Sequence, residues 1–269
     1  MSTSADTSED FQIPIEIAEA YEARFVPALF AEWAPITIDA ADLGPGDHLL
    51  DVACGTGIVA RTAREQFGSE VTVTGVDLNE AMLTVASRVE PEIDWRRGDV
   101  TDLPFERDSF DAAVSQMAFM FFPDRGRALA EMARVVRPGG RLAVVVPSAL
   151  DVQPAYEPFV DVAVAHTGDE ARSMLGTYWN CGDLPAFSAL ATSNGWSAVT
   201  SRTRIGTARF ASVQDFVDTE IDGTPLAERI SAAQRAAIVA DLTPRLAAYE
   251  TSGGLPIPFA CNVVSARVG

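Results

Sequence analysis

The chain of 269 residues contains no lysine, so arginine supplies all 20 basic side chains against 38 acidic ones. The net charge of −18 argues against nucleic acid or an anionic membrane as a partner, because both carry negative charge themselves. Long apolar runs are also missing, and none approaches the roughly 20 residues that a membrane-spanning helix needs. We therefore expect a soluble protein with neither nucleic acid nor membrane as partner.

Histidine and cysteine are scarce. The two histidines, His48 and His166, are too few to suggest a His/Cys zinc site, so no metal site is expected. The three cysteines are odd in number, far apart and without C-x-x-C spacing, which favours reduced thiols and a cytoplasmic location. The N-terminal residues are polar rather than basic and then apolar, so no signal peptide is expected.

Residues 48–60 have the pattern of a buried strand, a glycine turn and a helix. An apolar run contains Asp51, small residues follow as far as Gly57, and an amphipathic segment begins at residue 58. Gly55 and Gly57 let the backbone turn tightly and approach a ligand without a Cβ in the way. The spacing fits the G-x-G-x-x-G/A dinucleotide pattern, with Asp77 at the expected distance downstream.

Asp51 argues against a dinucleotide, because a carboxylate at this strand end would repel a pyrophosphate and attract a cation. S-adenosylmethionine has no phosphate and carries an ammonium and a sulfonium group. Residues 50–57, with the sequence Leu-Asp-Val-Ala-Cys-Gly-Thr-Gly, resemble the first motif of class I methyltransferases that use this cofactor. Ala53 departs from the glycine that is more usual in this motif, and is small enough for the loop.

Strands and helices alternate after this motif. Apolar or β-branched runs at residues 71–77, 93–100, 110–116 and 141–146 are separated by helical patterns at 58–67, 79–89 and 124–136. Such alternation predicts right-handed crossovers and a parallel sheet. Later strands at 198–205 and 259–268 take the places of the antiparallel pair in the family that the chain resembles. We expect an α/β fold: a Rossmann-like, doubly wound, mostly parallel seven-stranded sheet with an antiparallel last strand and helical cap inserts.

The expected organisation is a disordered tail at residues 1–10 and a single methyltransferase domain at residues 11–269. Three segments outside the alternating core are candidate caps, at about 11–43, 148–182 and 207–255. The first predicts a helix over residues 15–33 that is interrupted at Pro27, and then a short helix at 36–43. The second predicts a short helix around 160–165, and the third is helical over about 212–250.

The resemblance assigns adenosine-binding residues. Asp77 ends the second strand, where a carboxylate can accept hydrogen bonds from both ribose hydroxyls. Leu78 and Met82 follow it and are expected beside the cofactor. In methyltransferases of this kind an acid after the third strand binds the adenine amino group and a neighbouring N–H binds the ring, which implies Asp99 and Val100 here.

The resemblance also places residues around the methionine part of the cofactor. Asp51 is expected near its ammonium group, and Ser115 and Gln116 lie at the end of the fourth strand. In these enzymes an N-terminal segment closes over the cofactor, which makes Tyr21 and Trp33 secondary candidates, although both suit simple packing on the sheet. The Asn/Asp-Pro-Pro-aromatic motif of nucleic-acid amino-methyltransferases is missing after Ser115.

Substrate-binding candidates are aromatic. Phe119 follows the fourth strand, and Tyr178 and Trp179 lie in a cap segment. An aromatic face near a sulfonium is favoured by a cation–π attraction of about 0.5–2 kcal/mol. His166 is the one histidine in a cap, and a hydroxyl acceptor would profit from it as a general base, although a packing role suits it equally.

Five segments in the right order, ending with the Pro-Gly-Gly turn at residues 138–140, resemble small-molecule methyltransferases of the ubiquinone/menaquinone biosynthesis type. The resemblance implies methyl transfer from S-adenosylmethionine to O, N or C of a small, apolar or aromatic metabolite. The missing lysine suggests a GC-rich bacterial genome. A S-adenosylmethionine-binding protein, a S-adenosylmethionine-dependent enzyme with other chemistry, and an NAD-linked oxidoreductase remain as alternatives. A homodimer also remains open.

Overall fold

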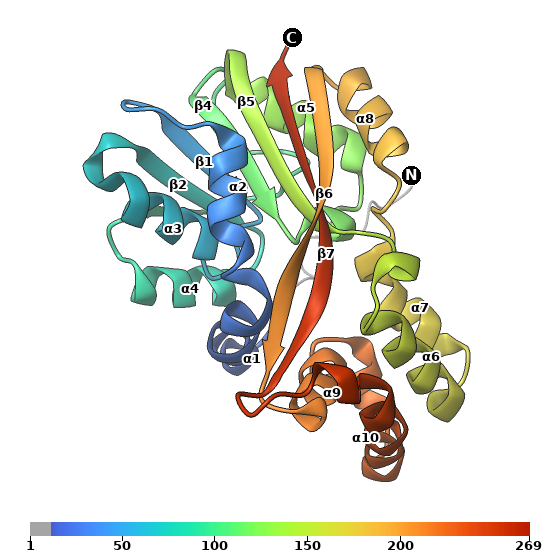
Figure 1. Cartoon of the computed structure of the whole chain (residues 1–269). Coiled ribbons are helices and arrows are strands. Elements are labelled where there is room, and N and C mark those ends of the chain that lie inside the picture. Colours follow the sequence, from blue (N-terminus) through green and yellow to red (C-terminus); the bar gives the residue numbers. More distant parts are fainter. Residues whose placement is uncertain (1–11) are drawn as a thin grey trace, which may run out of the picture.

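A single seven-stranded sheet organises the computed structural model, which describes residues 12–269 (Figure 1). The strand order is β3-β2-β1-β4-β5-β7-β6. β1 to β5 are parallel, and β7 runs antiparallel to both of its neighbours. The strands are β1 (His48–Val52), β2 (Thr72–Asp77), β3 (Asp94–Arg97), β4 (Phe110–Gln116), β5 (Val136–Pro147), β6 (Trp196–Phe210) and β7 (Leu255–Val268). The predicted fold class is confirmed. The tail expected at residues 1–10 lies outside the described residues.

Alternating side chains of the strands enter two hydrophobic cores, one on each face of the sheet. Leu49 of β1 belongs to the core under α2 (Trp33–Ala41) and α3 (Ile58–Phe67). Its neighbour Leu50 points to the opposite face, as the two-residue period of a strand requires, where α5 (Arg125–Val135) and α8 (Leu184–Ser193) pack. Because both faces are covered, the central strands β1, β4 and most of β5 are buried, whereas β3 and β6 at the sheet edges are largely exposed.

Polar residues set the beginnings of several helices, as the sequence suggests. Asn79 accepts hydrogen bonds from two backbone N–H groups at the start of α4 (Glu80–Val89). Asp124 and Asp183 cap α5 and α8 in the same way. The short 3-10 turns are η2 (Gly68–Glu70), η3 (Phe119–Phe121), η4 (Leu150–Val152), η5 (Thr177–Trp179), η6 (Pro225–Glu228) and η7 (Ala247–Tyr249).

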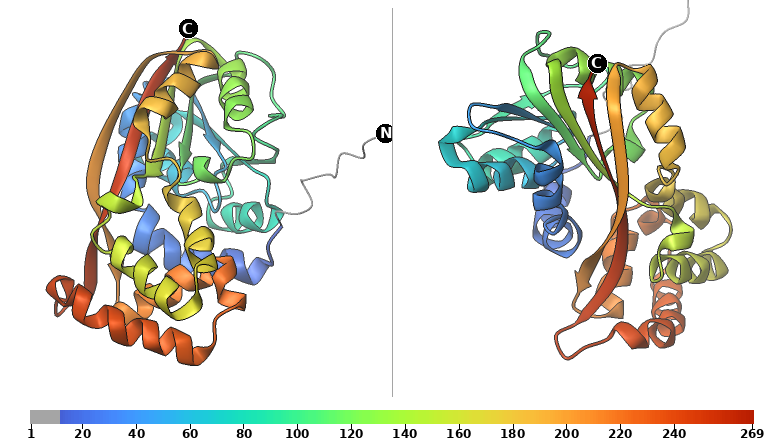
Figure 2. Two further views of the ribbon diagram at one scale, coloured as in Figure 1. Left: turned by 90° about the vertical axis from the view of Figure 1, so that its right-hand side faces the viewer. Right: turned by 45° about the horizontal axis from the view of Figure 1, so that its top comes forward.

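The antiparallel strand pair of β6 and β7 is longer than predicted. The two strands pair from Trp196 with Val268 to Phe210 with Leu255, whereas β5 stops pairing with β7 at Cys261. This strand pair therefore continues past the rest of the sheet, and Figures 1 and 2 show helices clustered around its far end. These helices are α6 (Tyr156–Thr167), α7 (Glu170–Gly176), α9 (Val213–Asp222) and α10 (Ala232–Leu246).

The N-terminal segment runs as α1 (Ile15–Ala20) directly into a π-helix, η1 (Tyr21–Phe30). The predicted interruption at Pro27 is wrong, because Pro27 lies inside η1 and the break comes at residues 31–32. A proline removes one backbone donor, and the irregular hydrogen bonding of a π-helix accommodates that loss. Within residues 12–269, no helix is both long and apolar enough to cross a bilayer.

Candidate active site

The site lies at the carboxyl ends of the parallel strands, where the sheet order reverses between β1 and β4. The loop from β1 to α3 has left-handed backbone at three positions, with φ of 55° at Ala53, 55° at Gly55 and 86° at Gly57. A non-glycine residue in this region costs roughly 1–2 kcal/mol, so Ala53 holds a position that glycine fills with less strain.

The two glycines of the loop have different roles. A Cβ on Gly55 would lie 3.6 Å from the hydroxyl of Tyr21, so this residue faces the N-terminal segment. A Cβ on Gly57 would lie 2.2 Å from the ring of Trp95 on β3. The sequence predicted that both glycines let the backbone approach a ligand, which stays a prediction, and the structure adds that Gly57 makes room for Trp95.

Asp77 shapes the loop. Its carboxylate accepts a hydrogen bond from the Gly55 N–H at 2.8 Å and another from the Asn79 N–H at 2.8 Å. Burial raises the pKa of this carboxyl, and backbone hydrogen bonds from Asn79, Gly55 and Leu78 oppose the shift. Each carboxylate oxygen has two lone pairs, so Asp77 keeps capacity for further donors such as ribose hydroxyls.

Asp51 is almost completely buried, with 1% of its surface exposed. It accepts a hydrogen bond from the N–H of Ala60, in the first turn of α3, at 3.1 Å. Burial raises its pKa from 3.8 to about 7, and the charge of Asp77 adds to the shift. Among residues 12–269 no arginine pairs with Asp51. A carboxylate already accepts from the helix terminus that a pyrophosphate would need, so this end of the sheet suits a ligand that carries a cation.

Asp99 begins the loop that follows β3. Its Oδ1 accepts hydrogen bonds from the Thr101 N–H at 2.7 Å and from the Thr101 hydroxyl at 2.8 Å. No described residue donates to its Oδ2. This geometry leaves one oxygen of Asp99 for an amino donor, in keeping with the predicted adenine contact.

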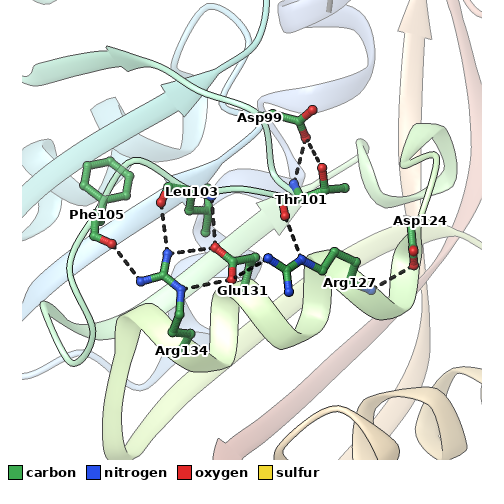
Figure 3. Close-up of polar contacts among 8 residues, drawn as sticks. All are labelled: Asp99, Thr101, Leu103, Phe105, Asp124, Arg127, Glu131 and Arg134. Carbon is green, nitrogen blue, oxygen red and sulfur yellow. Dashed lines mark hydrogen bonds and ion pairs between the residues drawn. The ribbon is translucent and has the colours of Figure 1, made fainter. Parts of the chain in front are cut away.

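Figure 3 shows how α5 holds this loop in place. The backbone N–H of Leu103 donates to Glu131, which is 3% exposed. Arg134 donates to Glu131 at 2.7 Å and to the carbonyls of Leu103 and Phe105 at 2.9 and 2.8 Å. Hydrogen bonds from Arg134 lower the pKa of Glu131, so the pair is ionised at neutral pH. The loop that carries Asp99 is therefore fixed by a buried ion pair.

The N-terminal segment is hydrogen-bonded to the start of α4 and to α3. Gln12 donates to the carbonyl of Leu78 and accepts from the N–H of Glu80, each within 3.1 Å. Glu22 of η1 accepts two hydrogen bonds from Arg61 of α3, at 2.9 and 3.1 Å. These contacts hold Tyr21 over Gly55.

Tyr21 connects the glycine loop with an aromatic cavity. Its ring stacks on Phe25 and Phe30, with centroid distances of 5.8 and 5.3 Å, and both of these residues line the cavity. Burial raises the pKa of the Tyr21 hydroxyl, and the charges of Asp77 and Tyr178 raise it further. Tyr21 is thus close to both parts of the site.

The cavity is lined by all three cap segments together with the ends of β4, β5 and β7. The space inside it that a water-sized molecule can occupy is about 30 Å³. Its walls are mostly aromatic or sulfur-containing and include one acid: Phe25, Leu29, Phe30, Met117, Met120, Pro147, Tyr156, Tyr178, Trp179, Glu220 and Phe259. Such a lining suits an apolar or aromatic molecule with one polar group.

Tyr178 and Trp179, which the sequence predicted as substrate contacts, line this cavity. Phe119 does not, because it is 1% exposed and packs on Phe122 and Phe187. Met117 and Met120 from the same run line the wall in its place. His166 is also absent from the lining, and its Nε2 pairs with Asp241 at 2.8 Å on α10.

The remaining predicted cofactor residues are either buried in the core or partly buried near Asp77 and Asp99 in the chain. Trp33 is fully buried and packs on Phe259. Gln116 uses its side chain to bind Thr37 and the carbonyl of Phe30, so it anchors the N-terminal segment. Leu78, Met82 and Val100 are partly buried beside Asp77 and Asp99 in the chain.

Two buried hydroxyls at this edge of the sheet, Thr56 Oγ1 and Ser115 Oγ, have no hydrogen-bond partner among the described residues. An unsatisfied buried group costs about 1–3 kcal/mol, so a polar ligand would stabilise them. Together with the acids Asp51 and Asp77 and the small Gly55, these groups fit a ligand that combines a cation with hydroxyl groups.

Glu220 is a cavity residue that the sequence analysis did not identify. The apolar face of α9 is formed by Val213, Phe216, Val217 and Ile221, and Glu220 falls on it by helical spacing. An acid in the middle of an apolar helix face is the signal that could have identified it.

Comparison with known proteins finds similarity to methyltransferases. Residues 50–144 match a family described as a methyltransferase domain. The demethylmenaquinone methyltransferase of Renibacterium salmoninarum is 38% identical over 128 residues, which are 47% of this chain and 51% of the relative. The nocamycin O-methyltransferase of Saccharothrix syringae is 32% identical over 178 residues, which are 60% of this chain and 63% of the relative.

A solved structure shares the fold. Phosphoethanolamine N-methyltransferase 2 of Haemonchus contortus, in complex with S-adenosyl-L-methionine, has a TM-score of 0.61 and 19% identity, and the match covers 100% of this chain and 60% of that one. The chain spans about half the length of several curated relatives that it matches. The family match includes the glycine loop, Asp77 and Asp99 but none of the cap segments that line the cavity.

The contact between Gly57 and Trp95 predicts a stability effect. Gly57→Ala should lower the free energy of unfolding by about 1–3 kcal/mol more than Gly139→Ala, measured by urea titration. Both glycines have positive φ, but a Cβ on Gly139 meets nothing within 4 Å, so that variant isolates the backbone strain. Equal losses in the two variants would contradict the packing role of Gly57.

The raised pKa of Asp51 predicts a pH-dependent effect. Between about pH 4 and pH 7 the folded chain holds a proton on Asp51 that the unfolded chain has released, so the burial of Asp51 costs more stability as the pH rises. Asp51→Asn should therefore raise the melting temperature more at about pH 8 than at about pH 5, by thermal denaturation. The exposed Asp94→Asn is the control, and an equal effect of Asp51→Asn at both pH values would refute the shift.

Proposed function

We propose that this protein transfers a methyl group from S-adenosylmethionine to O, N or C of a small, apolar or aromatic metabolite, because residues 50–144 form a methyltransferase domain of the class I type. The observation that carries the proposal is the aromatic cavity next to the glycine loop, joined to it through Tyr21. The names of the relatives, which include quinone and O-methyltransferases, support an acceptor of this kind.

The residues at the sheet edge would hold the cofactor as follows. Asp77 would accept from the ribose hydroxyls, and Asp99 with the N–H of Val100 would bind adenine. Asp51 would balance the ammonium group, and the small Gly55 would leave room beside Tyr21. The burial of Asp51 without a cationic partner favours this arrangement over a dinucleotide, since binding an ammonium group would supply the missing positive charge.

Bound S-adenosylmethionine supplies an electrophilic methyl group, so the protein contributes mainly position and exclusion of water. The N-terminal segment covers the glycine loop, held by Glu22 on Arg61 and by Gln12 on the strand end after β2. The cavity wall orients an acceptor by its shape and presents one acid, Glu220. His166, paired with Asp241 outside the cavity lining, gains no support as a base from this arrangement.

We also propose that residues 11–269 act as one catalytic domain, because residues of all three cap segments and of the sheet line one cavity. Cys54, Cys181 and Cys261 are free thiols, which supports a cytoplasmic location. Neither a homodimer nor a macromolecular partner is needed to complete the cavity.

Calorimetry on the purified protein tests the proposal. S-adenosylhomocysteine should bind, and NADH should not, because a pyrophosphate would meet Asp51 at the start of α3. Asp77→Asn should weaken S-adenosylhomocysteine binding about ten-fold or more, by loss of charge-assisted hydrogen bonds, whereas Asp94→Asn should leave it unchanged. Binding of NADH with no binding of S-adenosylhomocysteine would sink the proposed function.

A further inference from the structure

Glu220 is a wall residue of the aromatic cavity with one hydrogen bond from the protein. Its Oε1 accepts from the hydroxyl of Tyr156 at 3.0 Å, and Tyr156 is 1% exposed. No described residue donates to Oε2 of Glu220. Glu220 remains partly accessible, as a cavity wall does, while the surrounding protein raises its pKa to about 7.

Charges around α9 leave Glu220 without a cation. Arg24 of η1 pairs with Asp215 and Asp222, and Arg235 of α10 pairs with Asp218 and Asp222. Two further arginines near α9 are also engaged, Arg209 of β6 with Glu32 and Arg229 after η6 with Glu170. Glu220 is therefore the one acid of α9 without an ion pair among residues 12–269.

The titratable groups nearest to Glu220 are tyrosines of two other elements. Tyr156 comes from α6, and Tyr178 comes from η5 and donates weakly to the carbonyl of Gly223 at 3.4 Å. Burial raises the pKa of both hydroxyls, and the charge of Glu220 raises them further, so both stay protonated at neutral pH. Glu220 is thus the group in this wall that exchanges a proton near neutrality.

A second polar group of the wall is also unpaired. The indole N–H of Trp179 is buried and has no hydrogen-bond partner among the described residues. The Trp179 Nε1 atom is closed off from solvent, so the free polar atom of the cavity wall is Glu220 Oε2, between aromatic side chains. A hydroxyl group can donate a hydrogen bond to this oxygen.

We propose that Glu220 is the proton acceptor of the methyl transfer, oriented by the hydroxyl of Tyr156, and that the methyl acceptor is an aromatic molecule with a phenolic or enolic hydroxyl. The proposal rests on the proposed function for the reaction and on the cavity for the acceptor. Glu220 takes the place that the sequence analysis gave to His166.

The methyl transfer forms one bond, breaks one bond and releases one proton. The acceptor oxygen forms its new bond to the methyl carbon, the bond from that carbon to sulfur breaks, and its electron pair stays on sulfur. The proton of the acceptor hydroxyl moves to Oε2 of Glu220, which becomes neutral and later releases the proton to water. Because Glu220 must begin ionised, both the hydroxyl contact and the reaction strengthen as the pH rises through about 7.

Equilibrium dialysis with 2-naphthol and 2-methylnaphthalene tests this assignment, because the two probes differ only by a hydroxyl in place of a methyl group. With S-adenosylhomocysteine present, 2-naphthol should bind wild type more tightly at about pH 8 than at about pH 6. Glu220→Gln should weaken 2-naphthol binding about ten-fold at about pH 8 and abolish the pH dependence. Binding of 2-methylnaphthalene should depend on neither the pH nor Glu220.

Two further variants separate the role of Glu220 from a structural one. Glu157→Gln, an exposed acid next to Tyr156 in the chain, should leave 2-naphthol binding unchanged. Tyr156→Phe removes the hydrogen bond that lowers the pKa of Glu220, so it should move the pH dependence of 2-naphthol binding to higher pH. A shifted midpoint is a result that loss of packing alone does not produce.

The proposal is overturned if 2-naphthol fails to bind, or if Glu220→Gln binds it as wild type does. S-adenosylhomocysteine affinity, measured on the same samples, should be equal in wild type and Glu220→Gln. If S-adenosylhomocysteine does not bind, the proposed function fails. If 2-naphthol still binds wild type more tightly than Glu220→Gln in that case, Glu220 still binds a hydroxyl group in the cavity.

Discussion

The approach of Tyr21 to Gly55 is the contact on which the rest of the site depends. Gly55 is the point where the loop after β1 comes within reach of the N-terminal segment, and Asp77 fixes that point by accepting its N–H. The other side of Tyr21 stacks on Phe25 and Phe30, which line the aromatic cavity. A Cβ on Gly55 would be in ordinary contact with Tyr21 at 3.6 Å, so the left-handed backbone is the main reason that this position favours glycine.

Each of the two parts of the site, the glycine loop and the aromatic cavity, contains an acid that has no ion pair among the described residues. Asp51 at the start of α3 and Glu220 in the cavity wall each have a pKa of about 7, in both cases chiefly because of burial. The arginines near α9 are held in ion pairs with other acids, and Arg61 near the loop is held by Glu22. The protein thus carries two carboxyl groups whose missing partners are a positive charge at Asp51 and a proton donor at Glu220. In our proposal, a strongly acidic chain uses these two carboxyl groups to bind a cationic cofactor and a hydroxyl acceptor.

The sequence predicted the geometry of the parallel sheet better than that of the cap segments. The strand at residues 110–116 and the acid at Asp77 follow from local patterns, because a buried strand and its end are encoded by adjacent residues. The length of β6 and β7 was underestimated, since their outer ends pair only with each other and carry a mixed pattern. Tyr156, Tyr178 and Glu220 meet only through the packing of three distant segments, so no local pattern brought them together. Gly57 shows the same limit, because its need for glycine comes from Trp95 on another strand.

Hydrogen exchange of backbone amides, with and without S-adenosylhomocysteine, tests most directly whether the N-terminal segment and the glycine loop form one site. The account predicts that the ligand slows exchange in residues 53–60, in residues 99–101 and in residues 21–30 together. These segments lie on β1, β3 and η1 or directly after them, so common protection requires the contact at Tyr21. Protection of the loop with unchanged exchange in residues 21–30 would contradict it.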